Sequence, residues 1–288
     1  MAPQRLPRTL TVTDHDRTAV GLTYVYPVVS RRAGGVSVGI NLNTNNACNW
    51  RCIYCQVPDL KRGAAPPVDL AKLRSELSGF LDDVLNGDFM QRSVPDGARR
   101  LNDIALSGNG EPTSASEFAP VINLIGEVRA TLQVPVDVKT ILITNGSLVH
   151  HRKIREGLTR LQAINGEVWF KLDSATAAGM QKLNDTHIGV GRVTENLGIA
   201  ARACPTWIQT CVLAIDGEGP DEAEQQAYLD FLGAQLAAGV PLRGVLLYGL
   251  ARASCQPEAP TLSSLPAPWL AAYSDLIRAL GIDVRVTP

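Results

Sequence analysis

Three of the six cysteines of the chain, Cys48, Cys52 and Cys55, are spaced C-x3-C-x2-C in a segment rich in asparagine. A loop with this spacing can fold three thiolates toward one point. Three thiolates on a four-iron cluster leave the fourth iron open to another ligand, and an open iron is reactive. The spacing therefore predicts a reactive [4Fe-4S] site.

Other uses of these thiols fit only part of the pattern. A structural zinc site needs a fourth ligand, and the loop holds no histidine, so His150 or His151 would have to come from another segment. A dithiol redox pair of Cys52 and Cys55 leaves Cys48 without a role. Buried structural thiols are disfavoured because asparagines and an arginine crowd the loop. An iron–sulfur cluster employs all three cysteines without a ligand from another segment.

Around this loop, short aliphatic runs alternate with longer stretches of helical periodicity, which is the pattern of β/α architecture. The runs predict strands at Val36–Leu42, Asp103–Ser107, Lys139–Thr144, Glu167–Asp173, Trp207–Ala214 and Arg243–Tyr248. In parallel barrels the chemistry lies on the loops after the strands, and the opposite end mainly serves stability. The cysteine loop follows the first strand and meets this requirement. We expect an α/β fold built as a partial barrel of six β/α units.

Two of the helices between the strands are well marked. One is predicted over residues 68–85 by apolar residues at three- and four-residue steps, namely Leu70, Leu73, Leu77, Leu81 and Val84. Another is expected to begin at Pro220 and to end at Gly239. Residues 1–35 are interpreted as a short N-terminal extension and residues 36–288 as one barrel domain, with Gly87–Arg100 as a polar insertion.

The cysteine loop, Tyr54 directly before its last cysteine, and its place after the first strand resemble the radical S-adenosylmethionine (radical SAM) superfamily. The resemblance implies a partial (β/α)6 barrel of the radical SAM type. It implies two cofactors, a [4Fe-4S] cluster on the three cysteines and S-adenosyl-L-methionine bound to the open iron. One electron from the cluster would cleave the cofactor to a 5′-deoxyadenosyl radical, which takes hydrogen from the substrate. Tyr54 would pack beside the adenine.

A glycine-rich motif follows the second strand. Gly108 and Gly110 let the backbone approach a ligand, and the Glu111 carboxylate can accept from an ammonium. With Asn109 between the glycines, the motif resembles the segment that holds the methionine amino group in the superfamily. After the third strand, Thr144-Asn145-Gly146 is similar to a turn often found there, so Asn145 joins the predicted cofactor residues.

The fourth strand ends with two charged residues on the same side, Lys171 and Asp173. Charges inside a barrel are costly unless they are paired or used. They form either an internal ion pair or contacts with the cofactor's carboxylate and ribose, and we favour the contacts. Similar residues occur at this strand in the glycyl-radical activating branch of the superfamily.

The chain is most similar to the branch related to the tRNA wyosine-synthesis enzymes. The similarity lies in the run from Arg31 to Ile40, in Cys52–Gln56 and in Leu247–Arg252. This branch implies tRNA modification, although the chain lacks both the flavodoxin-like domain of some members and an evident basic character. Reduction of the cluster calls for an electron donor such as flavodoxin or ferredoxin.

Three functions stay open at this stage. A radical SAM enzyme would act on a small molecule, a tRNA base or a protein residue. A glycyl-radical-enzyme activase would take hydrogen from a glycine of a partner protein, which the compact chain and Lys171 with Asp173 favour. A noncatalytic iron–sulfur binding or electron-carrier protein would need neither Gly108–Glu111 nor an open iron. No catalytic residue is assigned, and His187 is interpreted as a solvated turn residue.

The other three cysteines are not expected to hold a second cluster. Cys204 precedes the fifth strand and Cys255 follows the sixth, so they should lie at opposite ends of the barrel. The ligands of one cluster must instead converge. Cys211, inside the fifth strand, is expected to be a small buried apolar residue.

Composition excludes several classes of protein. A hydrophobic share of 45% and a charged share of 19% are those of a folded globular chain, and a net charge of −1 gives no sign of nucleic-acid binding. The first residues lack the apolar run of a secretion signal, and no stretch approaches the ~20 apolar residues of a membrane span. We expect a cytoplasmic protein that does not enter the membrane.

Overall fold

The computed structural model describes residues 9–11, 17, 20–30 and 34–287. Parts of the expected extension 1–35 lie outside the described residues, namely 1–8, 12–16, 18–19 and 31–33. The last of these ranges belongs to the run that resembles the wyosine-related branch.

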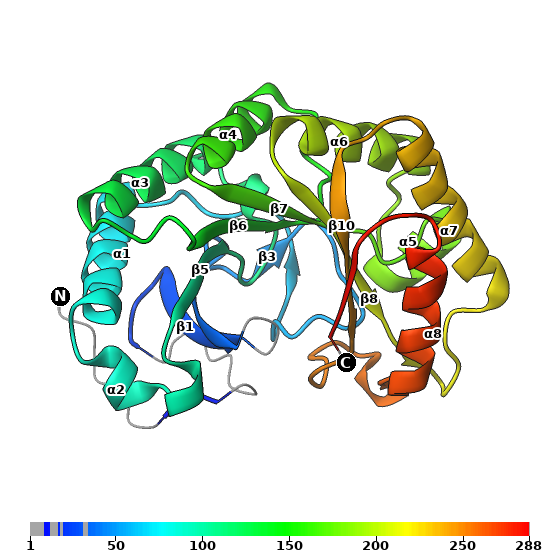
Figure 1. The fold of residues 1–288 in the computed structure, drawn as a ribbon, viewed down its shortest axis with the longest axis horizontal. Helices are drawn as coiled ribbons and strands as arrows, with labels where there is room; N and C mark the ends of the chain where they lie inside the picture. Colours follow the sequence, from blue (N-terminus) through cyan, green and yellow to red (C-terminus); the bar gives the residue numbers. More distant parts are fainter. Residues whose placement is uncertain (1–8, 12–16, 18–19, 31–33, 288) are drawn as a thin grey trace.

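A curved sheet of eight strands forms the centre of the molecule, in the order β1-β2-β5-β6-β7-β8-β10-β12. The strands are β1 Val25–Ser30, β2 Gly35–Ile40, β5 Leu101–Leu106, β6 Lys139–Thr144, β7 Gly166–Lys171, β8 Thr206–Val212, β10 Leu242–Gly249 and β12 Val284–Thr287. All neighbours are parallel except β1, which runs antiparallel to β2. Figure 1 shows the sheet as a partial barrel with the larger helices along its outer side.

The six predicted strands correspond to β2, β5, β6, β7, β8 and β10. Two further strands were missed. β1 contains Pro27, which argues against a central strand, and the structure accommodates it because β1 is the outermost strand of the sheet. β12 is only 4 residues long and pairs with the other edge, beside β10.

The helices that cover the sheet are α1 Leu70–Leu85, α3 Phe118–Thr131, α4 Arg152–Ala163, α5 Ala177–Asn184, α6 Val190–Ala203, α7 Glu222–Ala237 and α8 Ala267–Arg278. In α1 the predicted stripe is buried from Leu73 onward, and each such leucine contributes about 1.5–3 kcal/mol by leaving water. Asp69 caps its first turn by accepting from Lys72 N at 3.0 Å.

The helix predicted from Pro220 to Gly239 is α7, with tighter limits. Asp221, not Pro220, precedes its first turn and accepts from Glu224 N at 2.8 Å. Gly239 follows the helix with a φ of +67°, a backbone conformation that favours glycine.

Gly87–Arg100 is more than the polar insertion that was expected. It contains α2, Phe89–Ser93, and a short 3-10 turn, Asp96–Ala98. Phe89 is 1% exposed and meets the ring of Phe80 edge-on at 5.0 Å between centroids. A buried aromatic residue therefore fastens this segment to α1.

Four short strands lie outside the main sheet. β3, Ala47–Cys48, pairs with β4, Lys61–Arg62, and β9, Ala214–Ile215, pairs with β11, Leu262–Ser263. Two further 3-10 turns are Pro112–Ser114 and Ala259–Thr261. Among the described residues, no helix combines the length and apolar character that a bilayer crossing requires.

Candidate functional site

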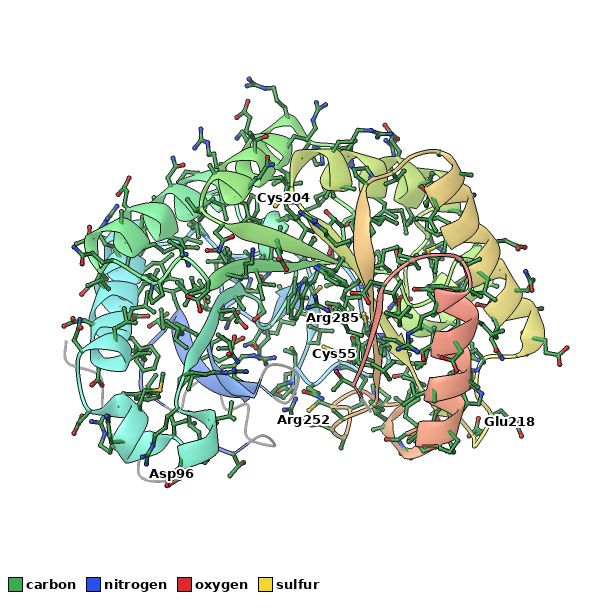
Figure 2. All side chains as sticks on the ribbon, viewed as in Figure 1. Cys55, Asp96, Cys204, Glu218, Arg252 and Arg285 are labelled. Atoms are coloured by element: carbon green, nitrogen blue, oxygen red, sulfur yellow. The ribbon has the colours of Figure 1, made fainter. Side chains whose placement is uncertain are left out.

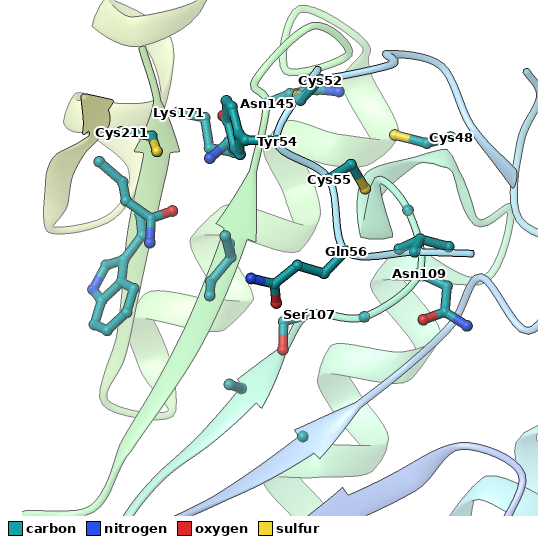
Figure 3. A pocket seen from close by; sticks show the side chains of 18 of the residues that line it. Cys48, Cys52, Tyr54, Cys55, Gln56, Ser107, Asn109, Asn145, Lys171 and Cys211 are labelled. Atoms are coloured by element: carbon teal, nitrogen blue, oxygen red, sulfur yellow. The ribbon is translucent and has the colours of Figure 1, made fainter. Parts of the chain in front are cut away.

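The carboxyl ends of the parallel strands border a cavity of about 370 Å³, a size typical of small-molecule sites. All predicted site residues except Asp173 line it, namely Cys48, Cys52, Tyr54, Cys55, Gly108, Asn109, Gly110, Glu111, Asn145 and Lys171. Figure 3 shows the three cysteines along one loop, with Lys171 beside Tyr54 of that loop and Cys211 on the neighbouring strand. The structure thus brings together residues from segments that are far apart in the sequence.

Backbone hydrogen bonds shape the cysteine loop. Cys55 N donates to Cys52 O at 2.9 Å and closes a tight turn between the last two of the three cysteines. Ahead of the turn, β3 fixes Cys48 by pairing with β4, and Asn43 Nδ2 donates to Ala47 O at 2.8 Å. The three thiols therefore stand on backbone that the fold holds in place.

Burial sets the protonation of these thiols. It raises the pKa of Cys48 to about 12 and that of Cys52 to about 11, and it also raises the pKa of Cys55. Such thiols hold their protons at neutral pH until a metal displaces them. No three His, Cys, Asp or Glu side chains in the described ranges converge closely enough for a single ion. A four-iron cluster has a different need, because it bonds each thiolate to a separate iron.

Arg51 joins the cysteine loop to two distant segments. Its guanidinium donates to both carboxylate oxygens of Glu258, at 2.9 and 2.7 Å, and to Asp185 Oδ2 at 3.2 Å. Two-pronged contact of this kind fixes geometry as well as charge. Asp185 follows α5 in the left-handed conformation and also pairs with Arg62 at 2.8 Å.

The segment after β10 forms a second attachment. Ser254 Oγ donates to Ile53 O at 2.7 Å, Cys255 N to Cys55 O at 2.8 Å, and Gln256 Nε2 to Val57 O at 3.0 Å. We call residues 254–258, which include Glu258, the clasp. The clasp binds the backbone on both sides of Cys55, the last cysteine of the loop.

The positions of Gly108 and Gly110 leave no room for a side chain. A Cβ on Gly108, whose φ is +150°, would lie 2.4 Å from Asn41 Oδ1, and one on Gly110 would lie 2.1 Å from Ala47 O. Asn109 Nδ2 donates to Asn46 Oδ1 at 2.6 Å. Within the described chain, the buried Asn109 Oδ1 accepts no hydrogen bond.

The Glu111 carboxylate is 3% exposed and already accepts several hydrogen bonds from the protein. Oε1 accepts from Thr113 N at 3.1 Å and from the hydroxyls of Thr113 and Thr144 at 2.6 Å, and Oε2 accepts from Asn145 N at 2.6 Å. Burial raises its pKa, although these donors favour the charged form. Glu111 therefore joins the loops after β5 and β6, and its direct contact with an ammonium stays a prediction.

Asn145 connects this junction to the cysteine loop. Its Nδ2 donates to Asn49 Oδ1 at 2.8 Å, and Asn49 Nδ2 donates to Ser147 Oγ at 2.7 Å. One hydrogen-bonded chain therefore runs from Glu111 through Asn145 to the residue after Cys48.

Lys171 lies between two aromatic rings. Its Nζ is 5.0 Å from the ring centroid of Tyr54 and 5.5 Å from that of Tyr248, and it donates to Tyr248 Oη at 2.8 Å. Burial alone would lower its pKa, but the charge of Asp173 and smaller contributions outweigh burial and raise it. Lys171 is therefore a half-buried cation at the cavity.

Asp173 lies behind the cavity wall and binds protein groups. Its Oδ1 accepts from Cys211 N at 2.8 Å, and its Oδ2 accepts from Asn184 Nδ2 at 2.7 Å and from the Tyr54 hydroxyl. Burial, followed by the charge of Asp173, raises the pKa of Tyr54, which keeps that hydroxyl a donor. Contact of Asp173 with the cofactor stays a prediction, whereas its hold on Tyr54 is a feature of the structure.

Sequence reasoning missed Asn184, the last residue of α5. It is 1% exposed, and its Nδ2 lies 3.3 Å from Cys52 Sγ. In the sequence Asn184 looks like any polar residue at the end of a helix. Its contact with Cys52 depends on where the end of α5 lies in the folded chain, which the helical pattern does not show.

Of the other histidines and cysteines considered from the sequence, namely His150, His151, His187, Cys204, Cys211 and Cys255, only Cys211 lines the cavity. His187 is exposed, and the rings of His150 and His151, before α4, meet at a tilt of 36° with 4.2 Å between their centroids. Cys204 is buried before β8, at the amino end of the sheet, whereas Cys255 contacts the cysteine loop, so these two lie at opposite ends as predicted. Figure 2 shows the separation of Cys204 from Cys55. Cys211 is buried, as expected, yet it also lines the cavity.

Comparison with known proteins gives distant relatives. No protein-family model matches the chain. It is similar to UPF0026 proteins of two Helicobacter pylori strains, with 26% identity over 55% of this chain and 44% of the relative, and 23% identity over 72% and 60%. It is also 27% identical to a UPF0026 protein of Methanocaldococcus jannaschii, over 56% of this chain and 43% of the relative. The chain thus spans about half the length of these curated relatives.

Solved structures share the fold at low identity. A radical SAM methyltransferase from Sphaerobacter thermophilus aligns with a TM-score of 0.59 and 13% identity, over 88% of this chain and 66% of that one. A spore photoproduct lyase variant aligns at 0.56 and 11%, over 84% and 74%. Streptococcus suis SuiB, bound to S-adenosylmethionine, aligns at 0.53 and 12%, over 86% and 45%. The partial barrel is therefore the fold found in radical SAM enzymes.

Proposed function

We propose that the chain is a radical SAM enzyme that holds a [4Fe-4S] cluster on Cys48, Cys52 and Cys55 and S-adenosylmethionine in the adjoining cavity. Together these groups supply reductive cleavage of the cofactor to a 5′-deoxyadenosyl radical that abstracts hydrogen from a substrate. The observation that carries the proposal is the meeting of the cysteine loop, the Gly108–Gly110 turn and Lys171 at one cavity of this fold.

The residues present fit these cofactors. The glycines leave no room for side chains, so a ligand there would meet backbone. The buried Asn109 Oδ1, which accepts nothing from the described residues, suits the ammonium of the cofactor. The half-buried Lys171 ammonium suits the carboxylate of the cofactor.

The chain's own side chains would mainly bind and orient. Glu111 holds the ends of β5 and β6 together, and Asp173 fixes the Tyr54 ring through its hydroxyl. The ring can then offer one face to an adenine. Because these groups are already fixed by protein contacts, little ordering is left for the moment of binding.

Within the superfamily, we propose the branch related to the wyosine-synthesis enzymes, which makes tRNA a substrate to test. The support is the sequence similarity around Cys52–Gln56 and Leu247–Arg252. Leu250, Ala251 and Arg252 line the cavity, so part of this similarity lies at the candidate site. A flavodoxin or ferredoxin as electron donor, and a cytoplasmic location, stay predictions.

The test is anaerobic reconstitution with iron and sulfide, reduction with S-adenosylmethionine present, and measurement of 5′-deoxyadenosine. We expect the wild type and the Cys204→Ala control to form it and Cys52→Ala to form none. Full cleavage by Cys52→Ala would refute the assignment. A wild-type protein that holds four irons but yields no 5′-deoxyadenosine would favour the noncatalytic carrier.

A further inference from the structure

The side chain of Asn184 reaches the cluster loop from the end of α5. Its amide nitrogen lies 3.3 Å from Cys52 Sγ and 2.7 Å from Asp173 Oδ2. An amide nitrogen carries two hydrogens, so one can serve the sulfur and the other the carboxylate. The carboxylate also settles which end of the amide points inward, because the amide oxygen in that place would face another acceptor.

The backbone around Asn184 leaves this amide little freedom. Arg51 N donates to Asn184 O at 3.1 Å, and Ile53 N donates to Leu183 O at 2.9 Å. The end of α5 and the cysteine loop are therefore joined on either side of Cys52. Asn184 is also 1% exposed, so water does not compete readily for its hydrogens.

Hydrogen bonds to the sulfurs of an iron–sulfur cluster help to set its reduction potential. A donor dipole aimed at the sulfur stabilises the extra negative charge of the reduced cluster, and burial strengthens the effect. We propose that Asn184 is a positioning residue that raises the reduction potential of the cluster through its hydrogen bond to the Cys52 sulfur. This inference rests on the proposed function, since it needs the cluster on that cysteine.

The second contact of Asn184 links the cluster ligand to the cofactor cavity. Asp173, which accepts from Asn184, also accepts from Tyr54 and from Cys211 N. Loss of the Asn184 amide would therefore remove one donor from Asp173 while leaving the other two. Tyr54 should keep its hydrogen bond to Asp173. The reduction potential of the cluster should therefore shift while the affinity for the cofactor stays near the wild-type value.

The experiment is a redox titration of the reconstituted protein, without S-adenosylmethionine, followed by the electron paramagnetic resonance signal of the reduced cluster. The variants are Asn184→Ala and Asn184→Leu, both of which remove the donor, and leucine keeps about the volume of the asparagine. The control is Asn196→Ala, because Asn196 is a buried amide that donates to Gly146 O at 2.8 Å instead. Iron content and circular dichroism are measured first.

We expect the potential to fall by a similar amount in Asn184→Ala and Asn184→Leu and to stay at the wild-type value in Asn196→Ala. A shift caused only by an empty cavity would be smaller in Asn184→Leu, because leucine refills the space. If Asn184→Ala does not fold, Asn184→Leu decides alone. Equal potentials in wild type and Asn184 variants, or an equal shift in the control, would overturn the inference. A wild type without iron would instead show that the proposed function has failed.

Discussion

The two ends of the barrel use polar groups differently. At the amino end, Cys204 donates to Gly166 O at 3.4 Å, and Lys139 pairs with Glu167 at 3.4 Å, so polar groups are satisfied by near neighbours in the sheet. At the carboxyl end, Glu111 and Asp173 each accept from several segments. The difference shows which end is built to hold loops in a fixed arrangement.

The contacts at the carboxyl end also span longer stretches of chain. Arg51 and Glu258 are 207 positions apart, and Asn184 and Cys52 are 132 apart. Such contacts exist only after the barrel has folded, because closing loops of this length is entropically costly. The cysteine loop therefore depends on the complete domain for its geometry.

Of the substitutions considered, Glu111→Gln should have the largest effect on stability and on cofactor binding, because it alters a junction at the carboxyl end of the barrel. In either orientation the new amide nitrogen faces a backbone N–H, of Thr113 or of Asn145, where the carboxylate accepted. We expect a loss of about 3 kcal/mol in unfolding free energy and at least a tenfold weaker binding of S-adenosylmethionine. Denaturant melts and equilibrium binding measure the two quantities.

The matched control is Glu127→Gln, which removes only a surface ion pair with Arg74. It should change stability by less than about 0.5 kcal/mol. If Glu111→Gln behaves like this control, the junction between β5 and β6 does not depend on the carboxylate. Unchanged iron content in Glu111→Gln would show that its effect is on the cofactor and not on the cluster.

Asp103→Asn tests a buried charge inside the barrel, away from the loops. Burial raises the pKa of Asp103 to about 6 in the folded chain, from an ordinary value of 3.8. The folded state therefore binds the proton more tightly, and stability falls as pH rises between these values. Asn carries no such cost, so the variant should gain about 2 kcal/mol over wild type between pH 4 and pH 8. Thermal melts of wild type and variant across this pH range measure the difference in stability. A difference that does not change with pH would contradict the prediction.

Arg51→Gln should have the smallest effect on stability. Arg51 is 31% exposed, so loss of its contacts with Glu258 and Asp185 should cost about 1 kcal/mol. The loop would be held less firmly to the clasp, and a chelator should remove iron from the reconstituted protein faster than from wild type. Arg192→Gln, which breaks a surface pair with Glu195, is the control. Equal rates of iron loss would show that the clasp does not protect the cluster.

Much of this architecture could be predicted from local patterns. Alternation of apolar runs located six strands, and the stripe from Leu73 to Val84 located α1, because both follow from burying one side of an element. β1 was missed because Pro27 is acceptable only at a sheet edge, and edge position is a property of the whole sheet.

The candidate site could be predicted only in part for the same reason. Position after a strand identified the cysteines and Gly108–Glu111, and all of them line one cavity. The partners of these residues could not be predicted, since Asn184 and the clasp reach the loop through tertiary packing. The roles of Glu111 and Asp173 as junctions likewise depend on donors from other segments.

The central claim is that Cys48, Cys52 and Cys55, and no other thiols, hold one four-iron cluster. The most direct measurement is iron and sulfide content after anaerobic reconstitution and desalting of two triple variants. With Cys204, Cys211 and Cys255 changed to alanine, the protein should keep about four irons per chain, as the wild type does. With Cys48, Cys52 and Cys55 changed to alanine it should keep none, and retention of about four irons by that variant would contradict the account.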